Sequence, residues 1–131
     1  MTALPFFVYG TLRPGEYNHD RFLLGRTARE EPARLPGALL YDGPGYPYVV
    51  PGDGLVAGDL VTAAPDTYAE LLAVLDRVEL PAGYERAERE VVRVADGATV
   101  RAWVYFAAPG TPYGPLIRGG DWRARPGPRT S

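Results

Sequence analysis

The chain has 131 residues, the size of a single domain with one hydrophobic core. Its net charge of −2 at pH 7 argues against a nucleic-acid partner, because phosphate contacts call for a basic face. All 14 basic residues are Arg, Cys is absent and His19 is the one histidine, which excludes disulfides, thiol or lysine nucleophiles and multi-histidine metal sites.

Strand-like runs dominate the chain, beginning with residues 4–9. Further strands are expected at about 27–33, 36–42, 46–50, 55–63, 85–94 and 98–107. Asp96-Gly97 is expected to join the last two as a hairpin turn, and residues 18–24 to form one or two helical turns. Many short strands with a single strong helix predict an α+β domain built around a curled or closed sheet.

The junction at the end of the first strand is a candidate ligand site. An apolar run ending in Phe7-Val8-Tyr9 stops abruptly at Gly10-Thr11-Leu12, followed by Arg13-Pro14-Gly15. A sharp turn here leaves backbone N–H groups free to bind a carboxylate or an oxyanion. A plain strand followed by an ordinary Pro-Gly turn explains the same residues.

The predicted helix runs from Asp66 to about Glu79, with a start signal and cap in Pro65-Asp66-Thr67. Its apolar stripe consists of Tyr68, Leu71, Leu72, Leu75 and Val78, with Glu70 and Arg77 on the opposite face. Asp76 lies at the edge of the stripe and is expected to be a solvated or capping acid. His19 is expected to be a surface or loop-bracing residue.

Glu79 continues the apolar face of this helix, because it follows Tyr68, Leu72 and Leu75 at helical spacing. Burial raises the pKa of a carboxyl group toward neutrality, which suits a general acid/base. Two other interpretations stay open. The helix can end before Glu79 and leave the carboxylate in water, or Glu79 can form a structural ion pair with Arg86 or Arg89.

Two segments together resemble the γ-glutamylcyclotransferase-like (AIG2-like) superfamily. Tyr9-Gly10-Thr11-Leu12 resembles its Y-G-[ST]-L loop, and 75–79 with Tyr84-Glu85-Arg86 resembles its L-D-x-[FV]-E … Y-x-R segment. The late strand at 102–105 and the ending Gly119-Gly120-Asp121-Trp122 also fit the family. The likeness spans residues 5–122.

The resemblance implies a small mixed β-barrel flanked by helices, and cyclisation of a γ-glutamyl amine or amino acid to 5-oxoproline without metal or cofactor. It implies Glu79 as the catalytic acid/base, with substrate held by Tyr9, Gly10, Thr11 and Leu12. It places Tyr84, Arg86 and Tyr105 near the pocket. The family often has an aromatic residue before the acid and Gly after it, so Val78 and Leu80 here are expected to alter pocket depth or substrate.

Two other functions stay open: a non-catalytic module of the same fold that binds a small carboxylate or a partner, and an enzyme acting on another amide or urea-type bond. The sequence lacks a long apolar stretch or a signal-peptide pattern, so a cytoplasmic protein without membrane contact is expected. A single domain over 1–122, a flexible tail over 123–131, and a monomer or weak homodimer complete the expectations.

Overall fold

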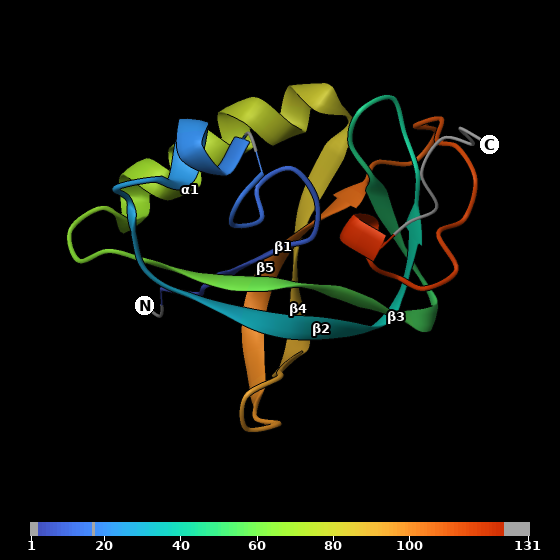
Figure 1. Cartoon of the computed structure of the whole chain (residues 1–131). Helices are drawn as coiled ribbons and strands as arrows, with labels where there is room; N and C mark the ends of the chain where they lie inside the picture. The colour runs from blue at the N-terminus through green and yellow to red at the C-terminus, as the bar shows by residue number, and fades with distance from the viewer. Residues whose placement is uncertain (1–2, 17, 125–131) are drawn as a thin grey trace.

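A computed structural model describes residues 3–16 and 18–124 and contains five strands among them. The elements in chain order are β1 (Phe6–Val8), the short π-helix η1 (His19–Leu23), β2 (Thr27–Tyr41), β3 (Tyr48–Ala63), α1 (Tyr68–Glu79), the 3-10 turn η2 (Leu80–Ala82), β4 (Tyr84–Arg93), β5 (Thr99–Ala107) and the 3-10 turn η3 (Trp122–Ala124). Figure 1 shows the strands gathered around one core, with α1 alongside them.

The strands close into a barrel in the order β1-β3-β2-β4-β5. β1 is antiparallel to β3 but parallel to β5, with Phe6 opposite Trp103. The other pairs are antiparallel. Because the first strand closes the barrel against the last, all three of its residues are buried. The predicted α+β barrel flanked by helices is therefore confirmed.

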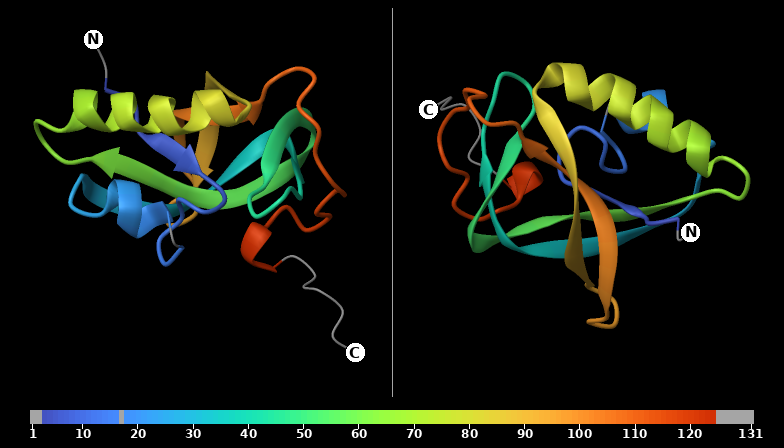
Figure 2. Two further views of the ribbon diagram at one scale, coloured as in Figure 1. Left: turned by 90° about the horizontal axis from the view of Figure 1, so that it is seen from above. Right: turned by 180° about the vertical axis from the view of Figure 1, so that it is seen from behind.

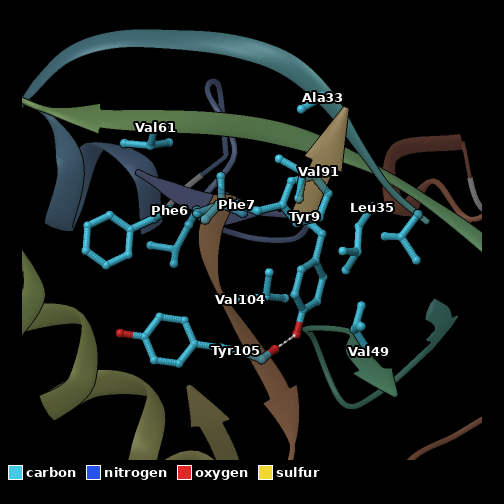
Figure 3. Close-up of a cluster of buried hydrophobic side chains, with 14 of the residues drawn as sticks. Phe6, Phe7, Tyr9, Ala33, Leu35, Val49, Val61, Val91, Val104 and Tyr105 are labelled. Atoms are coloured by element: carbon cyan, nitrogen blue, oxygen red, sulfur yellow. Dashed lines mark hydrogen bonds between the residues drawn. The ribbon is translucent and has the colours of Figure 1, made fainter. Parts of the chain in front are cut away.

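The barrel interior is filled by apolar side chains from every strand (Figure 3). Phe6 and Phe7 from β1 meet Val104 from β5, with Val61 from β3 nearby, and all four are almost fully buried. The Tyr9 hydroxyl group donates a hydrogen bond of 2.5 Å to the carbonyl oxygen of Tyr105. The residue that follows β1 is thereby tied to β5, 96 positions later.

Two expected strand breaks are wrong, because β2 and β3 each run straight through residues that are typical of turns. The register shifts between Pro36 and Ala38, where Gly37 has φ +75°, so the irregularity is a bulge in a continuous strand. Opposite this bulge, a Cβ atom on Gly52 would lie 2.5 Å from Leu39 Cδ1. Glycine permits this close approach of the two strands.

Helix α1 lies along one side of the barrel (Figure 2) and buries Leu71 and Leu75 completely. Its first turn contacts the barrel through Tyr68, whose hydroxyl accepts a 2.9 Å hydrogen bond from Trp103 Nε1. The predicted helix is confirmed, but the expected side-chain cap is wrong. The Thr67 hydroxyl instead donates to the carbonyl oxygens of Ala64 and Arg26, because Asp66, with φ +66°, turns the chain just before the helix.

The segment after β5 returns along the β2–β3 end of the barrel (Figure 1). The Gly120 carbonyl oxygen accepts a 2.7 Å hydrogen bond from the Ala57 amide. The expected domain end at residue 122 falls inside η3, and residues 125–131 of the expected flexible tail lie outside the described residues. No helix among the described residues has the length and apolar character needed to cross a membrane.

Candidate active site

The loop after β1 forms one wall of a pocket of about 300 Å³. It turns tightly, because the Arg13 amide donates a 3.0 Å hydrogen bond to the Gly10 carbonyl oxygen. Asn18 braces the loop, since its amide donates to the Thr11 carbonyl oxygen at 3.1 Å and its Nδ2 to Thr11 Oγ1 at 2.8 Å. A Cβ atom on Gly10 would lie 2.6 Å from Pro47 Cδ, so only glycine fits there.

This wall presents backbone donors without protein acceptors. Gly10, Thr11 and Leu12 line the pocket and are buried. Among the described residues, no acceptor receives a hydrogen bond from any of their three amides. Buried backbone donors are almost always paired, so unpaired ones at a pocket mark a place for a carboxylate or an oxyanion.

A buried ion pair fixes the end of this loop. Arg13 Nε donates to Asp59 Oδ2 on β3 at 2.7 Å, and Arg13 Nη1 donates to Asp121 Oδ1 at 2.9 Å. Arg13 and Asp59 are both buried. Asp121 belongs to the Gly119–Trp122 ending that was noted in the sequence, and its contact joins that ending to the loop. The loop is thus held from two sides.

Glu79 is the last residue of α1 and lines the opposite wall of the same pocket. The helix therefore does not end before it. The chain continues through η2 to Gly83, whose φ of +99° turns it into β4. Within the described part of the chain, the Glu79 carboxyl group makes no hydrogen bond and no ion pair. Burial raises its pKa from an ordinary 4.5 to about 7.

The alternative of a structural ion pair at Glu79 is wrong, because both arginines are engaged elsewhere. Arg86 donates to both carboxylate oxygens of Asp76, at 2.9 and 3.2 Å, and its guanidinium lies 4.3 Å from the centre of the Trp103 ring. Arg89 lies over the Phe106 ring. The expectation for Asp76 is also wrong. It is the acceptor of a half-buried network, which Tyr105 joins through a 2.7 Å hydrogen bond.

Three of the four tyrosines that line the pocket already use their hydroxyl proton within the protein. Tyr9 donates to the Tyr105 carbonyl, Tyr84 donates to the Pro47 carbonyl at 2.6 Å, and Tyr105 donates to Asp76. Burial raises the pKa of all three hydroxyl groups well above the ordinary value of 10.0. They stay protonated at neutral pH, and Glu79 is the one carboxyl group among the described residues that line the pocket.

Seven of the eight expected site residues line one pocket: Tyr9, Gly10, Thr11, Leu12, Glu79, Tyr84 and Tyr105. Arg86 does not line it and lies behind Tyr105 in the Asp76 network. Of the two flanking positions, Val78 lines the pocket and Leu80 is exposed without lining it.

The sequence interpretation missed a second group of lining residues: Phe7, Val8, Asn18, Arg21, Phe22, Tyr46, Pro47 and Ala82. Tyr46 and Pro47 reach the pocket only through the barrel's long-range packing, which no local pattern reveals. For Asn18, Arg21 and Phe22, closeness in sequence to the Gly10 loop was an available signal.

His19 is buried rather than at the surface, and it braces η1 against β2. Its Nε2 makes a short hydrogen bond to Glu30, and its Nδ1 lies 3.3 Å from Asp20. Burial lowers the pKa of His19, but the hydrogen bonds to both carboxylates outweigh that effect and raise it above 6.5.

The described residues contain no group of three or more His, Asp or Glu side chains able to hold a metal ion.

The comparisons with known proteins agree with this architecture. Residues 6–124 match the family model "Gamma-glutamyl cyclotransferase, AIG2-like". The gamma-L-glutamyl-butirosin B gamma-glutamyl cyclotransferase of Niallia circulans is 33% identical over 76% of the chain, and the chain spans 64% of that relative's length. A relative from Vibrio cholerae serotype O1 is also 33% identical, with 91% of this chain and 95% of that protein covered.

Among solved structures, the crystal structure of an AIG2-like protein from Mus musculus superposes with a TM-score of 0.65. It is 25% identical, and the match covers 98% of this chain and 97% of that one. The family-model match covers nearly all of the residues that the structure describes, and the curated relatives exceed 30% identity. The chain belongs to the AIG2-like gamma-glutamyl cyclotransferase family.

Proposed function

We propose that this protein converts a γ-glutamyl amide to 5-oxoproline and a free amine, with Glu79 as the general acid/base. The observation that carries the proposal is a carboxyl group of pKa about 7 in the same pocket as three backbone amides that have no acceptor among residues 3–16 and 18–124. A carboxyl group with a pKa near the working pH both accepts and returns a proton efficiently.

The substrate's glutamyl end fits the buried part of the pocket. The amides of Gly10, Thr11 and Leu12 supply donors for its carboxylate or for the carbonyl oxygen under attack. Burial strengthens such hydrogen bonds, since water does not compete for the donors. The rings of Tyr9, Tyr84 and Tyr105 supply the surrounding surface, because their hydroxyl groups are committed to the protein.

The reaction forms one C–N bond and breaks another. The α-amino nitrogen attacks the γ-carbonyl carbon and loses a proton to Glu79. The proton then passes from Glu79 to the nitrogen of the departing amine as its bond to the γ-carbon breaks. No atom of the protein is left bonded to the substrate. The ring closes within one molecule, so holding the glutamyl chain folded supplies a large part of the rate enhancement.

The test is an assay of 5-oxoproline release from a panel of γ-glutamyl amines and γ-glutamyl amino acids. We expect turnover by the native protein and a loss of about 10²- to 10⁴-fold in kcat for Glu79→Gln. Glu85→Gln is the matched control, because Glu85 is an exposed carboxylate on β4 outside the pocket and should leave kcat unchanged.

Turnover that survives Glu79→Gln would exclude the proposed acid/base. Binding of γ-glutamyl compounds without turnover would instead support the non-catalytic module, and release of ammonia without 5-oxoproline would support an enzyme acting on another amide.

A further inference from the structure

The pocket has a deep end and a mouth, and the two differ in exposure. The loop from Tyr9 to Leu12 is buried, whereas Arg21 of η1 is exposed and still lines the pocket. Phe22 lines it beside Arg21 and is partly buried. By exposure, η1, the short helix that packs against α1, therefore forms one side of the mouth, and Ala82 of η2 is also exposed there.

Arg21 places a positive charge at this mouth that has no ion-pair partner among the described residues. It is the one cationic side chain among the described residues that line the pocket, and it forms no ion pair with any of them. Asp20 beside it in η1 and Glu30 of β2 are engaged with His19, and Arg21 forms no ion pair with Glu79 of the same pocket. Its guanidinium carbon lies 5.3 Å from the centre of the Phe22 ring, which holds the group at the mouth.

A guanidinium group with free donors is the natural partner of a carboxylate. If the glutamyl end occupies the loop amides and Glu79, as in the proposed function on which this inference rests, the departing amine points away from the deep end. Whatever that amine carries then reaches the mouth, where Arg21 meets it. A cationic substituent would be repelled there and an anionic one attracted.

We propose that Arg21 is a specificity residue that selects γ-glutamyl amides whose departing amine carries a carboxylate group. The preferred substrate class is thus the γ-glutamyl amino acids, ahead of γ-glutamyl amides of uncharged amines or diamines. Discrimination arises from one exposed charge-assisted contact, so it is modest and sensitive to salt.

The test compares γ-glutamylalanine with γ-glutamylethylamide, which differ by a single carboxylate on the departing amine. Calorimetry on Glu79→Gln measures the two Kd values without turnover. We expect about five-fold tighter binding of γ-glutamylalanine at low salt. Adding Arg21→Gln should remove that difference and leave the Kd of γ-glutamylethylamide unchanged. Arg77→Gln is the matched control, because Arg77 is an exposed arginine on the far face of α1.

Equal Kd values for the two ligands, or binding of neither, would overturn this inference. So would an Arg21→Gln variant that weakens both ligands equally, since Arg21 would then hold the carboxylate of the glutamyl end. A parallel assay of 5-oxoproline separates the two proposals: selective binding without product leaves the role of Arg21 standing and removes the proposed reaction.

Discussion

At the residue scale, Glu79 and Asp76 show how two carboxylates on one helix acquire different chemistry. They lie three positions apart near the end of α1. Asp76 accepts hydrogen bonds from Arg86 and Tyr105, which satisfies its charge. Glu79 has no such partner among the described residues, and burial alone raises its pKa to about 7. Asp76 therefore positions Arg86 and Tyr105, and the proposed function assigns proton exchange to Glu79.

This difference predicts the pH dependence of activity. Glu79 must be ionised to accept the substrate's proton, so kcat/KM should rise with pH and level off with an apparent pKa of about 7. The measurement is a pH–rate profile of 5-oxoproline release at constant ionic strength, with Glu85→Gln as a control that keeps the same midpoint. A midpoint near 4.5 would show that the working carboxylate is solvated and contradict the assignment.

At the scale of elements, the site depends on the contact between the β1 loop and the segment before η3. Arg13 is buried between Asp59 and Asp121, and it directly follows Leu12. Asp59 is as buried as Arg13, whereas the Asp121 side chain is 34% exposed. The two acids should therefore contribute unequally to stability.

Replacing Arg13 with Met leaves the Asp59 carboxylate buried without its partner, so we expect a loss of about 3–5 kcal/mol in the free energy of unfolding. Asp121→Asn keeps the Arg13–Asp59 pair and should cost about 1 kcal/mol or less. Urea denaturation measures both. The Arg13→Met/Asp59→Asn variant removes the stranded charge and should regain part of the loss. Equal effects of the two single changes would contradict this ranking.

The sequence predicted correctly those helices and strands whose pattern of apolar residues lies within the element itself. The stripe from Tyr68 to Val78 defines α1 and places Glu79 toward the core, because helical spacing alone fixes that face. The merging of the expected strands into β2 and β3 was missed, since Pro36-Gly37 and residues 51–54 carry the residue types of turns. The structure uses them in a bulge that bends both strands, and only the pairing of the strands distinguishes the two outcomes.

The candidate site likewise contains residues that a sequence pattern indicates and residues that only the fold brings to it. Its loop was found from a motif and its acid from helical spacing and a motif, whereas Tyr46 and Pro47 reach it through tertiary packing. The expected place of Arg86 depended on the resemblance alone, and the structure assigns its guanidinium to Asp76 instead. A motif gives the residue types and their spacing in the sequence. It does not give the hydrogen-bond partner of a long side chain such as Arg86, because that partner depends on which groups the fold places nearby.

At the scale of the whole molecule, two titrating groups set the pH dependence of stability. The pKa of Glu79 is raised from 4.5 to about 7, so its stabilising contribution is complete below pH 4.5 and is lost as pH rises through 7. The pKa of His19 is raised above 6.5, so its contribution is complete below pH 6.5 and is lost at higher pH. Both effects have the same sign between pH 5 and 8.

Glu79 alone should therefore lower the free energy of unfolding by about 2–3 kcal/mol between pH 5 and 8, and His19 should add to this fall. Urea denaturation at the two pH values measures the change. Glu79→Gln should be more stable than the native protein at pH 8 and close to it at pH 4.5. A native protein that gains stability between pH 5 and 8 would contradict the assignment of both groups.

The closure of the barrel by β1 against β5 has a consequence for how the protein is made. Phe6 pairs with Trp103, and Arg13 binds Asp121, 108 positions later. Contacts between residues so far apart in the sequence form slowly, because the entropy lost in closing a long loop comes before the favourable contacts that offset it. A ribosome-bound chain that already contains the Gly10 loop and Glu79 still lacks the strand that brings them together. Because Tyr105 of β5 lines the pocket, we expect a complete pocket only after β5 has been synthesised and has paired with β1.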